Sequence, residues 1–256
     1  MKQRADRRPM RVFILLLVTL VFPGAMGGSA YGGDVTTRAL RSDELTAPET
    51  EKINVAFVVG PHATIIDFTG PWEVFQDVHV PGRGSSHDEM MPFELYTVAE
   101  TTDPIVATGG MRIIPDYSFE DAPQPRVIVV PAVQSSDAML EWLRNASKKA
   151  DITMSVCTGA FVVAKAGLLD GKSATTHHDF FEQFEERFPE IELKQGRRFV
   201  ENPGISTAGG LTSGMDLALR VVERYFGIEV AQTTADYMEY ESQGWRTNTP
   251  VVTSAP

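Results

Sequence analysis

The sequence contains a single cysteine, Cys157, in a chain of 256 residues. One cysteine excludes any disulfide bond within the chain and leaves an unpaired thiol. Positive charge is also scarce, because 23 Lys and Arg residues stand against 34 Asp and Glu, a formal net charge of −11. Nucleic acids and anionic lipid surfaces repel such an acidic protein. We therefore expect no nucleic acid among its partners.

Long apolar runs are absent as well. The N-terminal apolar run, residues 12–22, is shorter than the roughly 20 residues that a membrane-spanning helix needs. Basic residues precede this run and small residues follow it, which predicts a signal peptide over 1–30, cleavage near Ala30 and export; an uncleaved membrane anchor is the alternative. We expect a flexible leader over 31–51, one domain over 52–245 and a tail over 246–256.

The stretch from Asp151 to Leu169 surrounds the only cysteine. Its first part is apolar and β-branched and predicts a buried strand, whereas the part from Thr158 predicts a helix that ends near Gly171. Cys157 lies at the junction, and Gly159 suits a sharp turn there. A thiol at a helix N-terminus feels the positive end of the helix dipole. The pattern predicts a nucleophile elbow in which Cys157 has a lowered pKa. The alternative is a buried cysteine that acts only as a small apolar residue.

Strands and helices alternate along the rest of the chain. Apolar strands are expected at 52–60, 93–99 and 126–131, with shorter ones near 105–119, 173–176, 197–200 and 205–208. Helices are expected after Pro71, from Ser135, over 180–188 and from Leu211 to about Glu241 with a break at Gly227. Because several strands are apolar on both faces, we expect a mostly parallel central sheet with helices on both sides.

Three polar residues follow predicted strands and are expected at one edge of this sheet. They are Asp67, Cys157 and His177. Sites in parallel α/β folds lie at the carboxyl ends of strands, so these residues can converge. Asp67 lies between apolar neighbours and is either a helix-capping carboxylate or a partly buried acid in a pocket. His177 is either a structural residue or part of that pocket. The remaining histidines include His62, His79 and His87, and their spacing predicts no metal site.

Four segments in order resemble the DJ-1/PfpI superfamily. They are DFTGPWEVF from Asp67, SVCTGAF from Ser155, ATTH from Ala174 and GGLTSGMD from Gly209. The resemblance covers about residues 53–245 and is nearest to the isonitrile hydratase branch and to the sensor domains of AraC-type regulators. It implies a flavodoxin-like sandwich that forms a homodimer and uses no metal or organic cofactor. It also implies that Cys157 is the catalytic nucleophile.

Two details of the resemblance bear on chemistry. Protease and glyoxalase-type members place His after the cysteine, whereas Thr158 stands here, and Asp67 matches the acid of isonitrile hydratases. The Gly-Gly pair that often helps to form the oxyanion pocket is replaced by Ala132 and Val133, which narrow it. We count Gly70, Ala132, Val133 and His177 as pocket residues beside the catalytic set Cys157, Asp67 and Thr158.

These residues predict an exported, cysteine-dependent hydratase or hydrolase for a small substrate. In this hypothesis a Cys157 thiolate attacks an isonitrile, a protonated Asp67 supplies a proton, and Thr158 holds water or developing charge. Two alternatives remain. One is an exported protein that binds a small ligand without turnover. The other is an exported protein whose thiol responds to electrophiles or oxidants.

Overall fold

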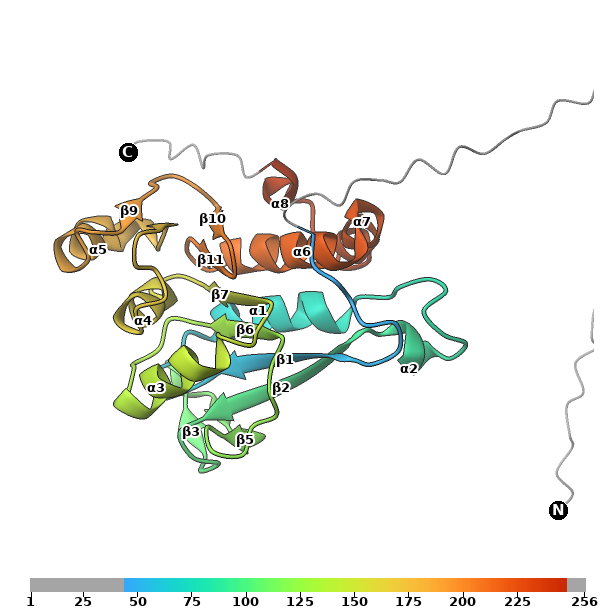
Figure 1. The fold of residues 1–256 in the computed structure, drawn as a ribbon, viewed down its shortest axis with the longest axis horizontal. Coiled ribbons are helices and arrows are strands. Elements are labelled where there is room, and N and C mark those ends of the chain that lie inside the picture. Colours follow the sequence, from blue (N-terminus) through green and yellow to red (C-terminus); the bar gives the residue numbers. More distant parts are fainter. Residues whose placement is uncertain (1–43, 248–256) are drawn as a thin grey trace, which may run out of the picture. The chain divides into compact units, whose positions relative to one another are not determined.

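The fold is built around one seven-stranded sheet (Figure 1). The computed structural model describes residues 44–247, which belong to the unit that runs from Leu40 to Pro256. The strand order is β10-β11-β7-β6-β1-β2-β5. The bounds are β1 Ile53–Val58, β2 Phe93–Ala99, β5 Tyr117–Ser118, β6 Val127–Val130, β7 Ile152–Ser155, β10 Phe199–Asn202 and β11 Ile205–Ala208. Every neighbouring pair is parallel except β10 with β11.

Five of the parallel strands follow the doubly wound order 2-1-3-4-5, which here reads β2-β1-β6-β7-β11. The predicted flavodoxin-like arrangement with a mostly parallel sheet is therefore confirmed. Two small sheets stand apart from it, in which β3 (Ile105–Val106) pairs with β4 (Arg112–Ile113) and β8 (Ser173–Ala174) pairs with β9 (Glu192–Leu193). The sequence predicted a strand near 173–176, but this strand lies outside the main sheet.

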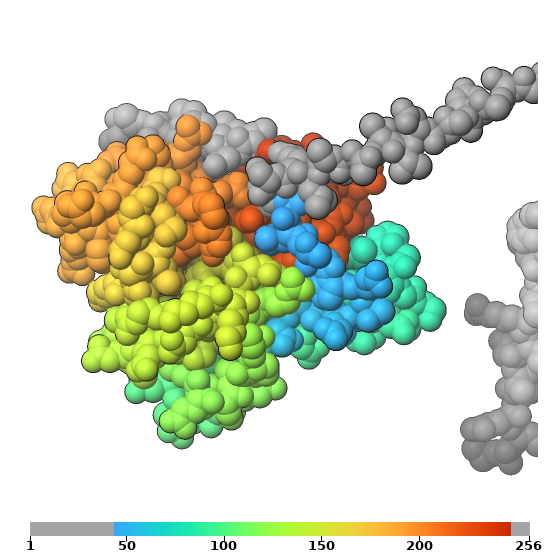
Figure 2. All heavy atoms as spheres, in the orientation of Figure 1, coloured from blue at the N-terminus to red at the C-terminus, as the bar shows by residue number. Residues whose placement is uncertain are grey.

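Helices cover both faces of the main sheet. Their bounds are α1 Ile65–Gln76, α2 His87–Met90, α3 Asp137–Ala146, α4 Gly159–Lys165, α5 Phe181–Arg187, α6 Ser213–Phe226, α7 Ile228–Tyr237 and α8 Gly244–Thr247, with short 3-10 turns η1 Thr108–Gly110 and η2 His178–Phe180. Residues of α1, α6 and α7 pack in one apolar cluster, and residues of α3, α4 and α5 pack in the other. The segments that carry α3, α4 and α5 form neighbouring parts of the surface in Figure 2.

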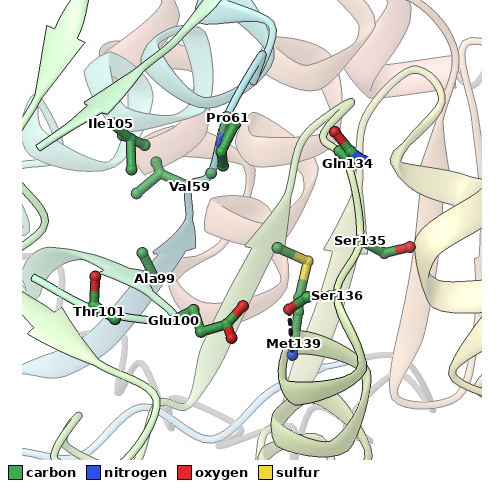
Figure 3. Close-up of a pocket in the computed structure, with 11 residues that line it drawn as sticks. Val59, Pro61, Ala99, Glu100, Thr101, Ile105, Gln134, Ser135, Ser136 and Met139 are labelled. Carbon is green, nitrogen blue, oxygen red and sulfur yellow. Dashed lines mark hydrogen bonds between the residues drawn. The ribbon is translucent and has the colours of Figure 1, made fainter. Parts of the chain in front are cut away.

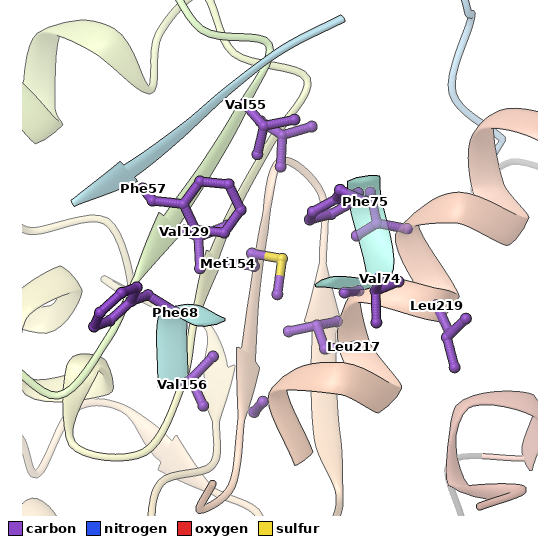
Figure 4. Packing of buried hydrophobic residues seen from close by; sticks show 14 of the residues in the cluster. Val55, Phe57, Phe68, Val74, Phe75, Val129, Met154, Val156, Leu217 and Leu219 are labelled. Atoms are coloured by element: carbon purple, nitrogen blue, oxygen red, sulfur yellow. The ribbon is translucent and has the colours of Figure 1, made fainter. Parts of the chain in front are cut away.

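Alternate side chains of β1 explain why both faces need a cover. Val55 and Phe57 point into the cluster of α1 and α6, whereas Ala56 and Val58 belong to the cluster of α3 and α4. Figure 4 shows Phe57 among residues of the first cluster, close to Val129. A strand with apolar side chains on both faces must be buried on both, which is why these segments read as continuous apolar runs.

The predicted limits of the helices around Pro71 and after Cys157 were wrong. Pro71 was expected in the first turn of a helix, but it lies inside α1, because that helix already begins at Ile65. Pro71 packs closely against α6, since a Cβ on Gly214 of that helix would lie 3.2 Å from Pro71 Cγ. The helix after Cys157 ends at Lys165 rather than near Gly171. Gly167 ends it, taking φ +77° while its N–H donates to the carbonyl of Ala164 at 2.8 Å.

The last part of the predicted leader belongs to the folded domain. The Leu45 N–H donates to the carbonyl of Arg224 at 2.8 Å, and Arg126 donates to the carbonyl of Thr46 at 2.7 Å. Leu45 and Ala47 also pack against the core. The predicted signal peptide and most of the predicted tail lie outside the described residues. No helix within residues 44–247 has the length and apolar composition needed to cross a membrane.

Candidate active site

Cys157 lies at the sharp turn between β7 and α4. Its φ is +58°, a left-handed conformation that costs a non-glycine residue about 1–2 kcal/mol. Two hydrogen bonds hold the turn, because the Cys157 N–H donates to the carbonyl of Gly209 at 2.8 Å and its carbonyl accepts from Thr176 Oγ1 at 2.9 Å. The side chain is 7% exposed. A strained junction that presents one thiol is the geometry of a nucleophile elbow.

Gly159 suits this turn as predicted, because a Cβ at this position would clash with the backbone. The left-handed conformation belongs to Cys157 itself, not to Gly159. A Cβ on Gly159 would lie 2.2 Å from the carbonyl oxygen of Val130 and 2.8 Å from that of Pro131. Only glycine therefore lets the first turn of α4 pass so close to the end of β6.

Asp67 reaches the same place from the first turn of α1. Thr64, not Asp67, occupies the N-cap position, so the capping interpretation of Asp67 does not hold. Its carboxyl is fully buried, and Oδ2 accepts a hydrogen bond from the Ala132 N–H at 3.1 Å. Oδ1 makes no hydrogen bond of good geometry to any residue of the described part. Burial raises the pKa of Asp67 to about 6, although the Ala132 N–H, the Cys157 thiol and the Leu211 N–H lower it.

The pKa of Cys157 contradicts the sequence prediction. Burial, with the neighbouring Asp67 carboxyl as the second cause, raises the pKa of the thiol to about 12. The backbone N–H groups of Thr158 and Leu211 lower this pKa but do not outweigh burial. A helix end acts mainly through such N–H groups, and its effect is limited where the charge has lost its water. At neutral pH the proton of the pair therefore resides on sulfur and Asp67 is mostly ionised.

The amide of Leu211 is a site group that the sequence did not predict. Leu211 has φ +53° and lies in the turn before α6, whereas the predicted helix began at this residue. Within residues 44–247, neither the Leu211 N–H nor the Thr158 N–H donates to a backbone carbonyl. Both amides lower the pKa of the Cys157 thiol, so both N–H groups are directed toward its sulfur. The Gly209-Gly210 pair indicated a turn in the sequence. It did not indicate that the backbone N–H of the following residue, Leu211, belongs to the site.

His177 lies at the margin of the site. A Cβ on Gly210 would lie 2.2 Å from His177 Cδ2, so the ring covers the turn that carries Leu211. Burial lowers the pKa of His177, with His178 as the second cause. Its Nδ1 accepts from the Asp179 N–H at 3.3 Å. Possible ligand atoms of His177, His178 and Asp179 lie within 4.8 Å of one another, a grouping that was not predicted from the sequence.

The remaining predicted pocket residues have different surroundings. Gly70 lies between helices, where a Cβ would approach Met215 Cγ at 3.0 Å, and it packs α1 against α6. The Ala132 N–H donates to Asp67, so it orients the acid and is not available to bind a substrate. Val133 lines an open groove together with Thr158.

Two cavities adjoin the loop after β6. The groove that Val133 and Thr158 line has a volume of about 340 Å³. A second cavity, of about 420 Å³, lies at the carboxyl ends of β1, β2 and β6 and contains Glu100 as its one charged lining residue (Figure 3). Gln134 and Ser135 line both cavities. None of the predicted catalytic residues lines the second cavity.

A doubly wound α/β domain with a cysteine elbow beside a buried acid defines the class of protein. The DJ-1/PfpI family model matches residues 53–224, and the chain belongs to this family. It is 29% identical over 197 residues to isonitrile hydratase from Pseudomonas putida, covering 73% of this chain and 78% of that protein. It is 30% identical over 133 residues to the HTH-type transcriptional regulator CdhR of Pseudomonas aeruginosa, covering 50% and 39% of the two chains.

The solved structures support the same fold. A THiJ/PfpI family protein from Pseudomonas syringae superposes with a TM-score of 0.63 at 23% identity, covering 82% of this chain and 84% of that one. At this identity the likeness concerns the fold. The proteins that this chain resembles include both a hydratase and a transcriptional regulator, so the activity must be argued from the site.

Proposed function

We propose that this protein is an exported hydratase that adds water to isonitriles, with Cys157 as nucleophile and Asp67 as proton carrier. The observation that carries this proposal is the buried pair itself, in which a protonated thiol lies beside a carboxylate that can accept its proton. The similarity to a known isonitrile hydratase supports the choice of substrate class.

The first step forms a bond between sulfur and the terminal carbon of R–N≡C. Asp67 removes the thiol proton as the sulfur attacks, and then delivers it to the same carbon, which gives the thioimidate R–N=CH–S–Cys157. Asp67 is protonated only between these two transfers. A pKa of about 6 therefore suits it both to accept the thiol proton and to release it to carbon. The Thr158 and Leu211 amides stabilise the charge that develops on sulfur.

The second step restores the enzyme. Asp67 takes a proton from water as the water oxygen attacks the thioimidate carbon, the C–S bond breaks, and the proton returns to sulfur. The other water proton ends on nitrogen, so the product is the formamide R–NH–CHO and the sum is one isonitrile plus one water. Thr158 is half-buried beside the thiol and its hydroxyl makes no capping bond, which leaves it available to hold this water.

Formamide formation tests the proposal directly. We expect the wild-type chain to convert simple alkyl isonitriles, and Cys157→Ala and Asp67→Asn each to lower the rate at least about a thousandfold. The double variant should lose little more, because two residues that act on one proton are not additive. Asp170→Asn, at an exposed position, is the matched control and should leave the rate unchanged. Additive losses, or an active Cys157→Ala, would contradict the mechanism.

A binding role without turnover is the second candidate. The similarity to a transcriptional regulator and the small exposure of Cys157 favour it. It predicts a wild-type rate equal to buffer across alkyl and aryl isonitriles, together with tight binding of a small ligand that survives Cys157→Ala. That combined result would replace the hydratase proposal.

Export and homodimer formation belong to the same proposal. The basic N-terminal residues followed by the apolar run 12–22 support a cleaved signal peptide, and membership of the family supports a dimer. Amino-terminal sequencing of the secreted chain should start near Tyr31, and light scattering should give twice the chain mass. A secreted chain that retains Met1 would contradict the cleaved signal peptide. A monomer would contradict the homodimer.

A further inference from the structure

The groove adjoins the candidate site through two lining residues that directly follow residues of that site, whereas Cys157 and Asp67 themselves do not line it. Val133 directly follows Ala132, whose N–H holds Asp67, and Thr158 directly follows Cys157. From there the groove is lined by α4 on one side and by η2 and α5 on the other. A molecule that reacts at Cys157 and extends past Thr158 would enter this groove.

The two charged residues that line the groove are both cations, Lys165 and Arg187. This stands out in a chain with 34 acidic and 23 basic residues. Among the described residues neither one forms an ion pair with a carboxylate; Lys165 contacts Ser135, and Arg187 lies over an aromatic ring. Both side chains are exposed and open to a ligand.

Both cations contact other residues that line the groove. Since an α-helix rises about 1.5 Å per residue, the backbone of Lys165 lies about 10 Å along α4 from Thr158, and side chains lean toward the helix N-terminus. The Lys165 ammonium donates to Ser135 Oγ at 3.3 Å, which holds it beside the loop of Val133. The Arg187 guanidinium lies 5.8 Å from the ring centre of Phe161, one turn beyond Thr158.

We infer that the groove selects a substrate with a carboxylate at the end opposite its isonitrile group, with a short aliphatic linker against Phe161 and Val133. This inference rests on the proposed function, which it narrows to isonitriles that carry an anionic end. The neighbouring cavity in Figure 3 does not suit the same ligand, because its Glu100 carboxylate repels an anion.

A pair of matched probes tests the inference. They are β-isocyanopropionate and its neutral analogue β-isocyanopropionamide, which differ in charge but hardly in size. We expect kcat/KM of the wild type to be at least about tenfold higher for the carboxylate, with a preference that shrinks at high salt. Lys165→Met and Arg187→Met should each lower kcat/KM for the carboxylate about fivefold and change that for the amide less than about twofold.

The control is Lys149→Met, which removes the same charge from a different surface cavity and should leave the preference unchanged. Equal turnover of the two probes by the wild type would overturn the inference while the proposed function stands. A preference that survives loss of both groove cations would overturn it as well.

If neither these probes nor simple alkyl isonitriles are turned over, the proposed function fails and binding still tests the groove. Calorimetry with N-formyl-β-alanine, the product of the carboxylate probe, then compares Cys157→Ala with the same variant lacking Lys165 and Arg187. Binding that depends on both cations supports anion selection by the groove. The absence of binding, or binding that ignores the two cations, overturns it.

Discussion

Replacing Asp67 with asparagine should change how the stability of the protein depends on pH. The carboxyl is fully buried, and its pKa is raised from 3.8 to about 6 in the folded state. Between these two values the folded chain holds a proton that the unfolded chain has released. The contribution of Asp67 to the free energy of unfolding should therefore fall as the pH rises from about 4 to about 6, and stay nearly level above that range.

The size of the effect follows from the two pKa values. Each pH unit between them corresponds to about 1.4 kcal/mol, so the buried carboxylate destabilises the fold at neutral pH by about 3 kcal/mol. Asparagine cannot ionise, yet its amide oxygen can still accept the Ala132 N–H. The stability of Asp67→Asn relative to wild type should thus increase by about 3 kcal/mol between about pH 4 and pH 7.

Urea unfolding of both proteins across this range measures the difference. Subtracting the two curves removes the contributions of all other carboxylates, and Asp170→Asn provides the exposed control, which should show no such trend. A difference between Asp67→Asn and wild type that does not vary with pH would refute the raised pKa. A difference that falls with pH would show that the carboxylate is stabilised in the fold.

Three further predictions concern the turn at Cys157. Gly159→Ala should cost several kcal/mol or prevent folding, because its Cβ would meet the Val130 carbonyl at 2.2 Å; a urea midpoint near wild type would contradict this close approach. Thr176→Val should cost about 1 kcal/mol, because it removes a buried hydrogen bond to the Cys157 carbonyl, whereas Thr175→Val should be neutral since that hydroxyl has no partner; equal losses would contradict the pairing. The Cys157 thiol should alkylate slowly up to about pH 9, as iodoacetamide kinetics can measure, and fast reaction near pH 7 would contradict its raised pKa.

The position of Cys157 could be predicted from sequence because it depends on local pattern. An apolar β-branched segment followed by a run of small helix-forming residues fixes a strand and a helix, and the residue between them must turn. The parallel sheet was predictable for a related reason, since apolar residues on both faces of β1 and β6 require helices on both sides.

The pKa of Cys157 was not predictable in the same way. The local helix end favours the thiolate, but the sign of the shift depends on burial and on Asp67, which α1 brings in from a distant part of the chain. Which atoms surround a thiol is decided by tertiary packing, and burial then outweighs the two amides. The predicted lowering of the Cys157 pKa was wrong because it considered only the helix end and not the burial of the thiol.

Leu211 shows a second limit of sequence reasoning. Its contribution is a backbone N–H in a left-handed turn, so the leucine side chain carries no signal for it. The helical pattern after Gly210 also favoured a helix start at this residue, whereas α6 begins at Ser213. A backbone group can be assigned to a site only when the path of the chain is known.

The dependence of turnover on pH tests the central claim most directly, namely that Cys157 and Asp67 share one proton during isonitrile hydration. In this mechanism the reaction starts from an ionised Asp67 and a protonated Cys157 thiol. With an alkyl isonitrile as substrate, kcat/KM for formamide formation should therefore rise through an apparent pKa of about 6 and stay level to beyond about pH 9. A rate that first rises near the pKa of a free thiol, about 8.5, would contradict the account, as would the absence of any formamide.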